Sequence, residues 1–175
     1  TVDSETLVMV AGSPSEPYSV VWVDLETGET EVLRKASTAT VGPAYLSVPE
    51  TIEFDTEDGA TAHAYYYPPK NDDFQAPSGE LPPVLVKSHG GPTSAAGTSL
   101  DLLIQYWTSR GFGLVDVNYG GSAGYGREYR RRLNGLWGIV DVDDCVNAAR
   151  SLVQRGLADG QRLAIDGGSA GGFTT

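Results

Sequence analysis

One stretch of the sequence decides the fold: Leu163-Ala164-Ile165-Asp166-Gly167-Gly168-Ser169-Ala170-Gly171. A short apolar run leads directly into the pattern G-x-S-x-G, which holds a nucleophilic serine on a sharp turn between a strand and a helix. The small residues around Ser169 let the backbone turn without a clash from a Cβ atom. A helix that begins at the serine would direct its free N–H groups and its dipole toward developing negative charge. The stretch therefore predicts a strand, a nucleophile at Ser169 and a helix in immediate succession.

The same five letters, GGSAG, also occur at residues 120–124, so the motif alone does not identify the nucleophile. After Ser122, the residues Tyr125 and Gly126 extend the turn before a helix can begin near Arg127. We interpret Ser122 as part of a glycine-rich loop. A dinucleotide-binding loop is excluded here, because these glycines are not spaced as G-x-G-x-x-G and the acidic residues about 20 positions later lie on a predicted helix.

A second glycine-rich loop, His89-Gly90-Gly91-Pro92, follows an earlier apolar run. An HGG loop can bring a backbone N–H group to the nucleophile, where it forms an oxyanion hole together with the N–H group of the residue after the serine. The donors would be Gly90, with Gly91 as the alternative, and Ala170. We expect His89 to organise the backbone of this loop. A Gly-Gly-Pro sequence alone is an ordinary surface turn, and the predicted elbow is what favours the functional interpretation.

Strand and helix patterns alternate around these loops. Apolar runs predict strands at 83–87, 114–117 and 162–166, and helical periodicity predicts helices at 99–110 and 141–155. Strands separated by helices form parallel sheets, whose functional loops gather at the carboxyl ends of the strands. The HGGP loop and both GGSAG loops follow such strands, and two further strands at 51–55 and 61–67 precede them. The sequence therefore predicts an α/β fold with its site at one edge of the sheet.

The beginning of the chain has a different pattern. Short β-prone runs at 7–10, 19–25 and 30–33 are separated by turns, and Thr27-Gly28 suits a hairpin turn. Three small antiparallel strands do not form an independent domain. We therefore expect them to belong to a larger all-β unit.

Composition excludes several classes of function. The formal net charge of -11 argues against a nucleic-acid-binding surface, and no apolar run approaches the roughly 18 residues that a membrane span needs. The single cysteine, Cys145, cannot form an intrachain disulfide, is expected to be a small buried residue, and favours a reducing compartment, which we take to be the cytoplasm. No metal or organic cofactor is implied, and the sequence does not determine the oligomeric state.

The ordered motifs resemble one known family. They are HGGP, NYGGSAGYG at 118–126, LWGIVDVDDCVNAA at 136–149 and GGSAGG at 167–172. Together they resemble the prolyl oligopeptidase family of serine peptidases, especially its acylaminoacyl-peptidase and dipeptidyl-aminopeptidase-like members. The resemblance implies a β-propeller followed by an α/β-hydrolase domain. Residues 1–45 would then be the last strands of the propeller, and residues 46–175 the N-terminal part of the catalytic domain.

The resemblance also assigns roles by position. Ser169 matches the acylated nucleophile, and Gly90 and Ala170 match the oxyanion donors. Other residues match structural positions in the elbow, the oxyanion loop and the neighbouring turn: Gly167, Gly171, His89, Gly91 and Ser122. One departure is Gly120, where the family often has Arg, so any contact made by that Arg is in doubt here.

A second departure concerns the catalytic triad. In α/β-hydrolases the acid and the histidine follow the serine along the chain. Only six residues follow Ser169 here, and both histidines, His63 and His89, precede it. We expect His63 to pack among neighbouring tyrosines. We therefore expect the 175 residues to be a piece of a longer protein, truncated at both ends, without the triad Asp and His and inactive alone.

The predicted function is that of a serine peptidase that cleaves short peptides through an acyl-enzyme at Ser169. A carboxylesterase with the same loop and elbow is one alternative, and the β-rich start of the chain argues against it, because a free-standing esterase needs no propeller. A catalytically silent binding or scaffold module is another. An intact elbow and oxyanion loop would have no use in such a module.

Overall fold

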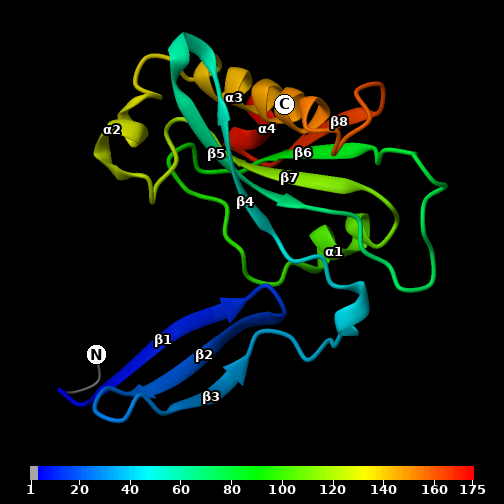
Figure 1. The fold of residues 1–175 in the computed structure, drawn as a ribbon. Coiled ribbons are helices and arrows are strands. Elements are labelled where there is room, and N and C mark those ends of the chain that lie inside the picture. Colours follow the sequence, from blue (N-terminus) through cyan, green and yellow to red (C-terminus); the bar gives the residue numbers. More distant parts are fainter. Residues whose placement is uncertain (1–3) are drawn as a thin grey trace.

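A computed structural model describes residues 4–175, which form two β-sheets and four α-helices (Figure 1). The first sheet contains β1 (Thr6–Ser13), β2 (Glu16–Asp24) and β3 (Thr30–Lys35). The second contains β4 (Glu50–Asp55), β5 (Thr61–Tyr67), β6 (Val84–Ser88), β7 (Gly113–Asn118) and β8 (Leu163–Gly167). The helices are α1 (Leu102–Thr108), α2 (Gly126–Arg131), α3 (Val140–Gln154) and α4 (Ala170–Thr174).

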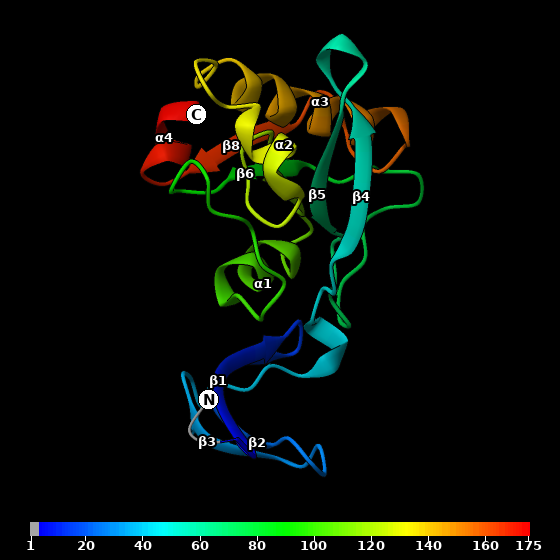
Figure 2. The ribbon, with the colours of Figure 1, turned by 90° about the vertical axis from the view of Figure 1, so that its left-hand side faces the viewer.

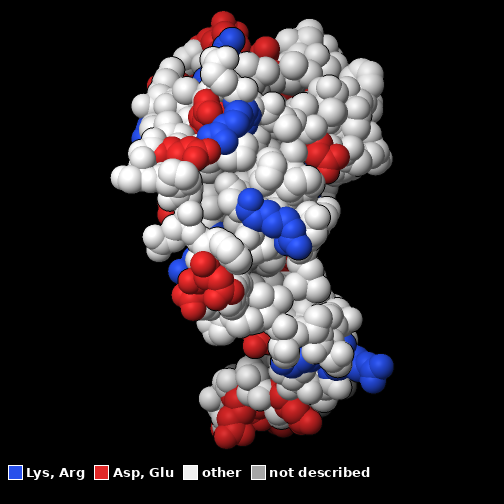
Figure 3. Space-filling view, turned by 90° about the vertical axis from the view of Figure 1, so that its right-hand side faces the viewer, with Lys and Arg blue, Asp and Glu red and all other residues white. Residues whose placement is uncertain are grey.

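The three-stranded sheet is antiparallel throughout, in the order β1-β2-β3. Gly28 has φ +73° in the turn between β2 and β3, a conformation that glycine adopts without strain. Within these strands only Ser19 is buried, so the described sheet has no core of its own. It forms the narrow lower part of the molecule, whose tip carries acidic side chains (Figures 1 and 3).

The five-stranded sheet has the order β4-β5-β7-β6-β8. Figure 2 shows its two outermost strands, β8 and β4, on opposite sides of the sheet. The β6 strand is parallel to both β7 and β8, as predicted, and the pairs β4–β5 and β5–β7 are antiparallel. Ser88 at the end of β6 pairs with Val117 of β7 and Gly167 of β8. The carboxyl ends of these three strands therefore meet at one edge of the sheet, together with the glycine-rich loops.

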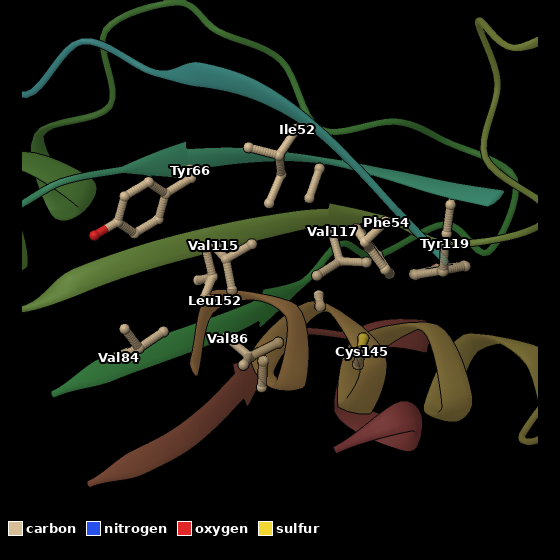
Figure 4. Close-up of a cluster of buried hydrophobic side chains, with 14 of the residues drawn as sticks. Ile52, Phe54, Tyr66, Val84, Val86, Val115, Val117, Tyr119, Cys145 and Leu152 are labelled. Atoms are coloured by element: carbon tan, nitrogen blue, oxygen red, sulfur yellow. The ribbon is translucent and has the colours of Figure 1, made fainter. Parts of the chain in front are cut away.

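Helices cover the two faces of this sheet. Alternate side chains of the central strands, including Val86 and Val117, pack against Cys145 and Leu152 of α3 (Figure 4). On the opposite face Ile104 of α1 packs with a smaller cluster. Cys145 is 2% exposed, so its predicted burial is confirmed.

Two helices differ from the prediction. Helix α1 begins three residues later than expected, because Asp101 caps it by accepting a hydrogen bond from the Leu103 N–H group at 2.8 Å. The apolar periodicity of residues 141–155 predicts that Val146 lies on the buried face of α3, but Val146 is 42% exposed and the buried face includes Asp141 and Asp144. Partners from distant segments make the burial of these two carboxylates possible. The predicted domain boundary at residue 45 falls between the two sheets and stays a prediction.

Candidate active site

Ser169 lies between the last residue of β8 and the first residue of α4. Its dihedral angles are φ 56° and ψ -118°, and among residues 4–175 only Asp58 shares a positive φ without being glycine. Such a conformation costs roughly 1–3 kcal/mol and persists only where the surrounding structure imposes it. The side chain is exposed, at the edge of the sheet where β6, β7 and β8 end. The strand, the sharp turn and the helix thus follow one another as the sequence suggested.

Two glycines allow α4 to lie directly against β6. A Cβ atom on Gly171 would overlap the backbone carbonyl of Ser88, and one on Gly167 would overlap both the Gly171 carbonyl and the Ser88 Oγ atom. The Ser88 hydroxyl donates a hydrogen bond to the Gly171 carbonyl at 2.9 Å. This close packing fixes the start of α4, and with it the orientation of Ser169.

The HGGP loop lies beside the serine. A Cβ atom on Gly90 would lie 3.0 Å from the Gly168 carbonyl oxygen and 3.3 Å from the Ser169 Cβ atom. Among residues 4–175 the backbone N–H groups of Gly90, Gly91 and Ala170 donate no hydrogen bond to protein atoms. The loop and the start of α4 therefore bring unused backbone donors close to Ser169.

The His89 side chain fixes the backbone of this loop. Its Nδ1 atom lies 3.1 Å from the Gly90 carbonyl oxygen, and its Nε2 atom lies 2.8 Å from the Ser122 Oγ atom. A carbonyl only accepts hydrogen bonds, so Nδ1 donates, and Nε2 of the neutral ring accepts from the Ser122 hydroxyl. Burial lowers the pKa of His89, which favours this neutral form. The ring also stacks on Tyr119, with ring centroids 4.4 Å apart.

The two serines of the repeated motif occupy different environments. Ser122 is fully buried, its hydroxyl is used by His89, and its N–H group donates to the Tyr119 carbonyl at 2.9 Å. Ser169 is exposed beside the free backbone donors. Of the two, only Ser169 can be reached by a substrate in this structure.

The second histidine lies in an aromatic cluster. His63 stacks on Tyr125 with ring centroids 4.3 Å apart and lies 5.2 Å from the Tyr129 ring. Its Nδ1 atom is 3.4 Å from a carboxylate oxygen of Glu53. Among residues 4–175, neither histidine forms a hydrogen bond with Ser169.

Sequence reasoning missed two groups of residues near the site. Asp141, at the start of α3, accepts hydrogen bonds from the Gly138 N–H group at 2.6 Å and from the Thr174 hydroxyl at 2.5 Å, and so ties α4 to α3. Acidic residues in a first helical turn are usually solvated and interact with the helix dipole, so the sequence carried no signal of this contact. The second group is formed by Asp116 on β7 with Lys87 and Asp101.

Residues 4–175 contain no group of three or more His, Cys, Asp or Glu side chains arranged to hold a metal ion. In the same part of the chain, every helix is too short or too polar to cross a membrane.

Comparison with known proteins shows which family this chain resembles. Residues 98–175 match the model of the prolyl oligopeptidase family. Over 174 residues the chain is 29% identical to the uncharacterized peptidase YuxL of Bacillus subtilis (strain 168), and this match covers 99% of the chain and 26% of that protein. Over 98 residues it is 38% identical to the acylamino-acid-releasing enzyme of Arabidopsis thaliana, a match to 56% of the chain and 13% of that enzyme. The chain is therefore similar to members of the prolyl oligopeptidase family.

Solved structures agree. A puromycin-hydrolyzing peptidase of Mycobacterium tuberculosis superposes with a TM-score of 0.96 at 53% identity, over 99% of this chain and 26% of that one. The chain thus spans about a quarter of the length of YuxL and of the puromycin-hydrolyzing peptidase. Its two sheets agree with the predicted fold class, in which the last strands of a β-propeller precede the N-terminal part of an α/β-hydrolase sheet.

Proposed function

We propose that Ser169 is the nucleophile of a serine peptidase that cleaves short peptides through an acyl-enzyme. The observation that carries the proposal is the conformation of Ser169, an exposed residue with φ 56° held at the junction of β8 and α4. Strained backbone of this kind is concentrated at functional sites. The attacking oxygen would approach a peptide carbonyl at the edge of the sheet, beside the HGGP loop.

The oxyanion formed by this attack needs hydrogen-bond donors that are already in place. We propose the N–H groups of Gly90 and Ala170, with Gly91 as the alternative to Gly90. His89 bears on this choice, because the carbonyl that it binds belongs to the same planar peptide group as the Gly91 N–H. The ring thereby sets the direction in which the Gly91 N–H points. His89 and Ser122 would thus act on the oxyanion through the backbone, without touching the substrate.

A serine hydroxyl is a weak nucleophile until a positioned base removes its proton. His89 is engaged by Ser122 and Gly90, and His63 stacks on Tyr125. We therefore propose that the base and the acid that orients it come from residues outside this chain. No metal or organic cofactor takes part in this scheme.

The names of the relatives suggest substrates. Beside the puromycin-hydrolyzing peptidase, a puromycin hydrolase of 50% identity has been solved as a serine-to-alanine variant complexed with PGG. We propose that the whole protein hydrolyses short peptides and the amide bond of puromycin. The single buried cysteine, Cys145, fits a reducing compartment, and we assign the protein to the cytoplasm on that basis.

A pair of serine variants of the whole protein tests the proposal. Ser169→Ala should lower kcat for a fluorogenic dipeptide by at least about 1000-fold, because the nucleophile is lost. Ser122→Ala is the matched control, and it should retain much of the activity, because it removes only a hydrogen bond to His89. The opposite pattern would assign the nucleophile to the first GGSAG copy.

The two alternatives are separated by further measurements on the same protein. Faster turnover of short-chain esters than of peptides would favour the carboxylesterase. A fluorophosphonate probe should label the wild type and not the Ser169→Ala variant. Absence of labelling in the wild type would favour a silent binding module.

A further inference from the structure

A cavity of about 550 Å³ lies between the three-stranded sheet and the five-stranded sheet. Tyr18 of β2 and Ala36, which follows β3, line it on one side, and Lys87 of β6, Asp116 of β7 and Asp101, the N-cap of α1, line it on the other. The two sheets are joined beside it, where the Leu100 N–H group donates to the Ser13 carbonyl at 2.8 Å. We call it the Asp116 cavity.

Asp116 is the unusual residue of this cavity. It lies on β7, its side chain is only 5% exposed, and its Oδ2 atom is 3.5 Å from Lys87 Nζ. Its Oδ1 atom is buried and has no hydrogen-bond partner among residues 4–175, the only such side-chain atom in that part of the chain. Buried polar atoms in proteins are almost always satisfied, so an unpaired carboxylate oxygen on a residue that lines a cavity calls for a donor.

The charges around Asp116 favour a cation. Lys87 Nζ lies 3.3 Å from Asp101 Oδ2 as well, so one ammonium group is shared by two carboxylates and the three side chains carry a net charge of -1. The acceptors of Asp101 are already used, Oδ2 by Lys87 and Oδ1 by the Leu103 N–H group. The free acceptor for an added positive charge is therefore Asp116 Oδ1.

The rest of the lining selects the kind of cation. The walls are mostly apolar, with side chains such as Ala36, Leu100 and Ile104, and the Tyr18 ring is part of the lining. His89 also lines the cavity, but its ring nitrogens are engaged by the Gly90 carbonyl and the Ser122 hydroxyl. The described residues contain no group of three or more His, Cys, Asp or Glu side chains that could hold a metal ion. A pocket with an apolar lining and one or two convergent polar groups suits a small organic molecule.

We propose that the Asp116 cavity binds a primary ammonium group carried on a small apolar body, with Asp116 Oδ1 accepting a hydrogen bond from the ammonium. A ligand of this class balances the charge of the Lys87–Asp101–Asp116 group, satisfies the buried oxygen and fills the apolar remainder of the cavity. The N-terminal residue of a peptide belongs to this chemical class. The proposal does not depend on the assignment of Ser169.

The test is calorimetric titration of the whole protein with benzylamine and, as the neutral analogue, benzyl alcohol. We expect benzylamine to bind measurably and Asp116→Asn to weaken it at least about tenfold, because a charge-assisted hydrogen bond is lost. Asp159→Asn is the matched control, since Asp159 pairs with Arg162 away from the cavity lining, and it should leave binding unchanged. Benzyl alcohol should bind at least tenfold more weakly than benzylamine.

A second variant keeps the test valid if Asp116→Asn does not fold. Ala36 lies on the opposite wall of the cavity and is exposed, so Ala36→Phe should fold and should block benzylamine by occupying the space. The proposal is overturned if benzylamine fails to bind the wild type at millimolar concentration. It is also overturned if benzyl alcohol binds equally well, or if the folded variants at positions 116 and 36 bind as the wild type does.

Discussion

The burial of the Asp116 carboxyl lowers the stability of the folded protein, and the rest of the fold offsets this loss. Burial raises the pKa of this carboxyl to about 6 from its ordinary value of 3.8, although the nearby Lys87 ammonium acts in the opposite direction. Between these two values the folded protein binds more protons than the unfolded chain. Stability contributed by this residue is therefore greatest below about pH 4 and falls as the pH rises through 6.

The Asp116→Asn variant of the whole protein should lack this pH dependence. At pH 7.5 we expect the free energy of unfolding to rise relative to wild type, by at most about 3 kcal/mol, because a buried charge is removed. At pH 4.5 the wild-type carboxyl is protonated in the folded state but still largely ionised in the unfolded chain, so the difference between the two proteins should shrink to about 1 kcal/mol. Urea denaturation at both pH values measures the difference, and an equal shift at the two values would contradict the assignment.

Ser169 also lowers the stability of the fold, through its strained backbone conformation. The sharp turn at Ser169, where φ is 56°, was predicted from the apolar run before it and the small residues around it. Ser122 was correctly placed in a loop, but its hydrogen bond to His89 could not be predicted. That contact depends on the neighbouring positions of β6 and β7 in the sheet, which join residues 33 positions apart in the chain.

At the scale of elements, the packing of α4 on β6 predicts that alanine substitutions at Gly168 and Gly171 have different effects on stability. A methyl group at Gly171 would overlap the Ser88 carbonyl, which is backbone and cannot move aside easily. Gly171→Ala should therefore destabilise the whole protein by several kcal/mol, as expected for overpacking at a backbone contact, or prevent its folding. Thermal unfolding measures the effect.

Gly168→Ala is the matched control for this substitution. No atom lies within 4 Å of a Cβ built at Gly168, so an added methyl group meets open space. Its melting temperature should stay within a few degrees of the wild type, as expected for a change of at most about 1 kcal/mol. Equal losses of stability in both variants would show that the elbow depends on flexibility and not on close packing.

The elements also show where prediction from the sequence succeeds and where it stops. Strands and helices were found because their apolar periodicity is local, and turns because glycine marks positive φ, as at Gly28. The buried face of α3 was misjudged because Asp144 is satisfied by the Gly120 N–H group and the Thr56 hydroxyl, two partners far away in the sequence. From the sequence alone, a carboxylate whose hydrogen-bond partners are distant is expected to be exposed to solvent, because its burial without partners would cost too much free energy.

At the scale of the whole molecule, the residues of the proposed catalytic centre lie on an open side of the sheet. β8 is an edge strand, and the apolar residues Leu163 and Ile165 on it are 42% and 39% exposed. Phe173 of α4, beside Ser169, is 65% exposed. The proposed nucleophile and oxyanion donors are thus held by packing within the chain, whereas the region around β8 and α4 is not covered by the residues described.

Activity should therefore require residues outside this chain. The chain of 175 residues, produced alone and shown by circular dichroism to be folded, should give no turnover of a fluorogenic dipeptide, because neither His63 nor His89 bonds to Ser169. The whole protein should turn the same substrate over. A positioned base is worth several orders of magnitude in rate, so the contrast should be large. Turnover by the isolated chain that disappears in Ser169→Ala would show that a base within these residues reaches the serine.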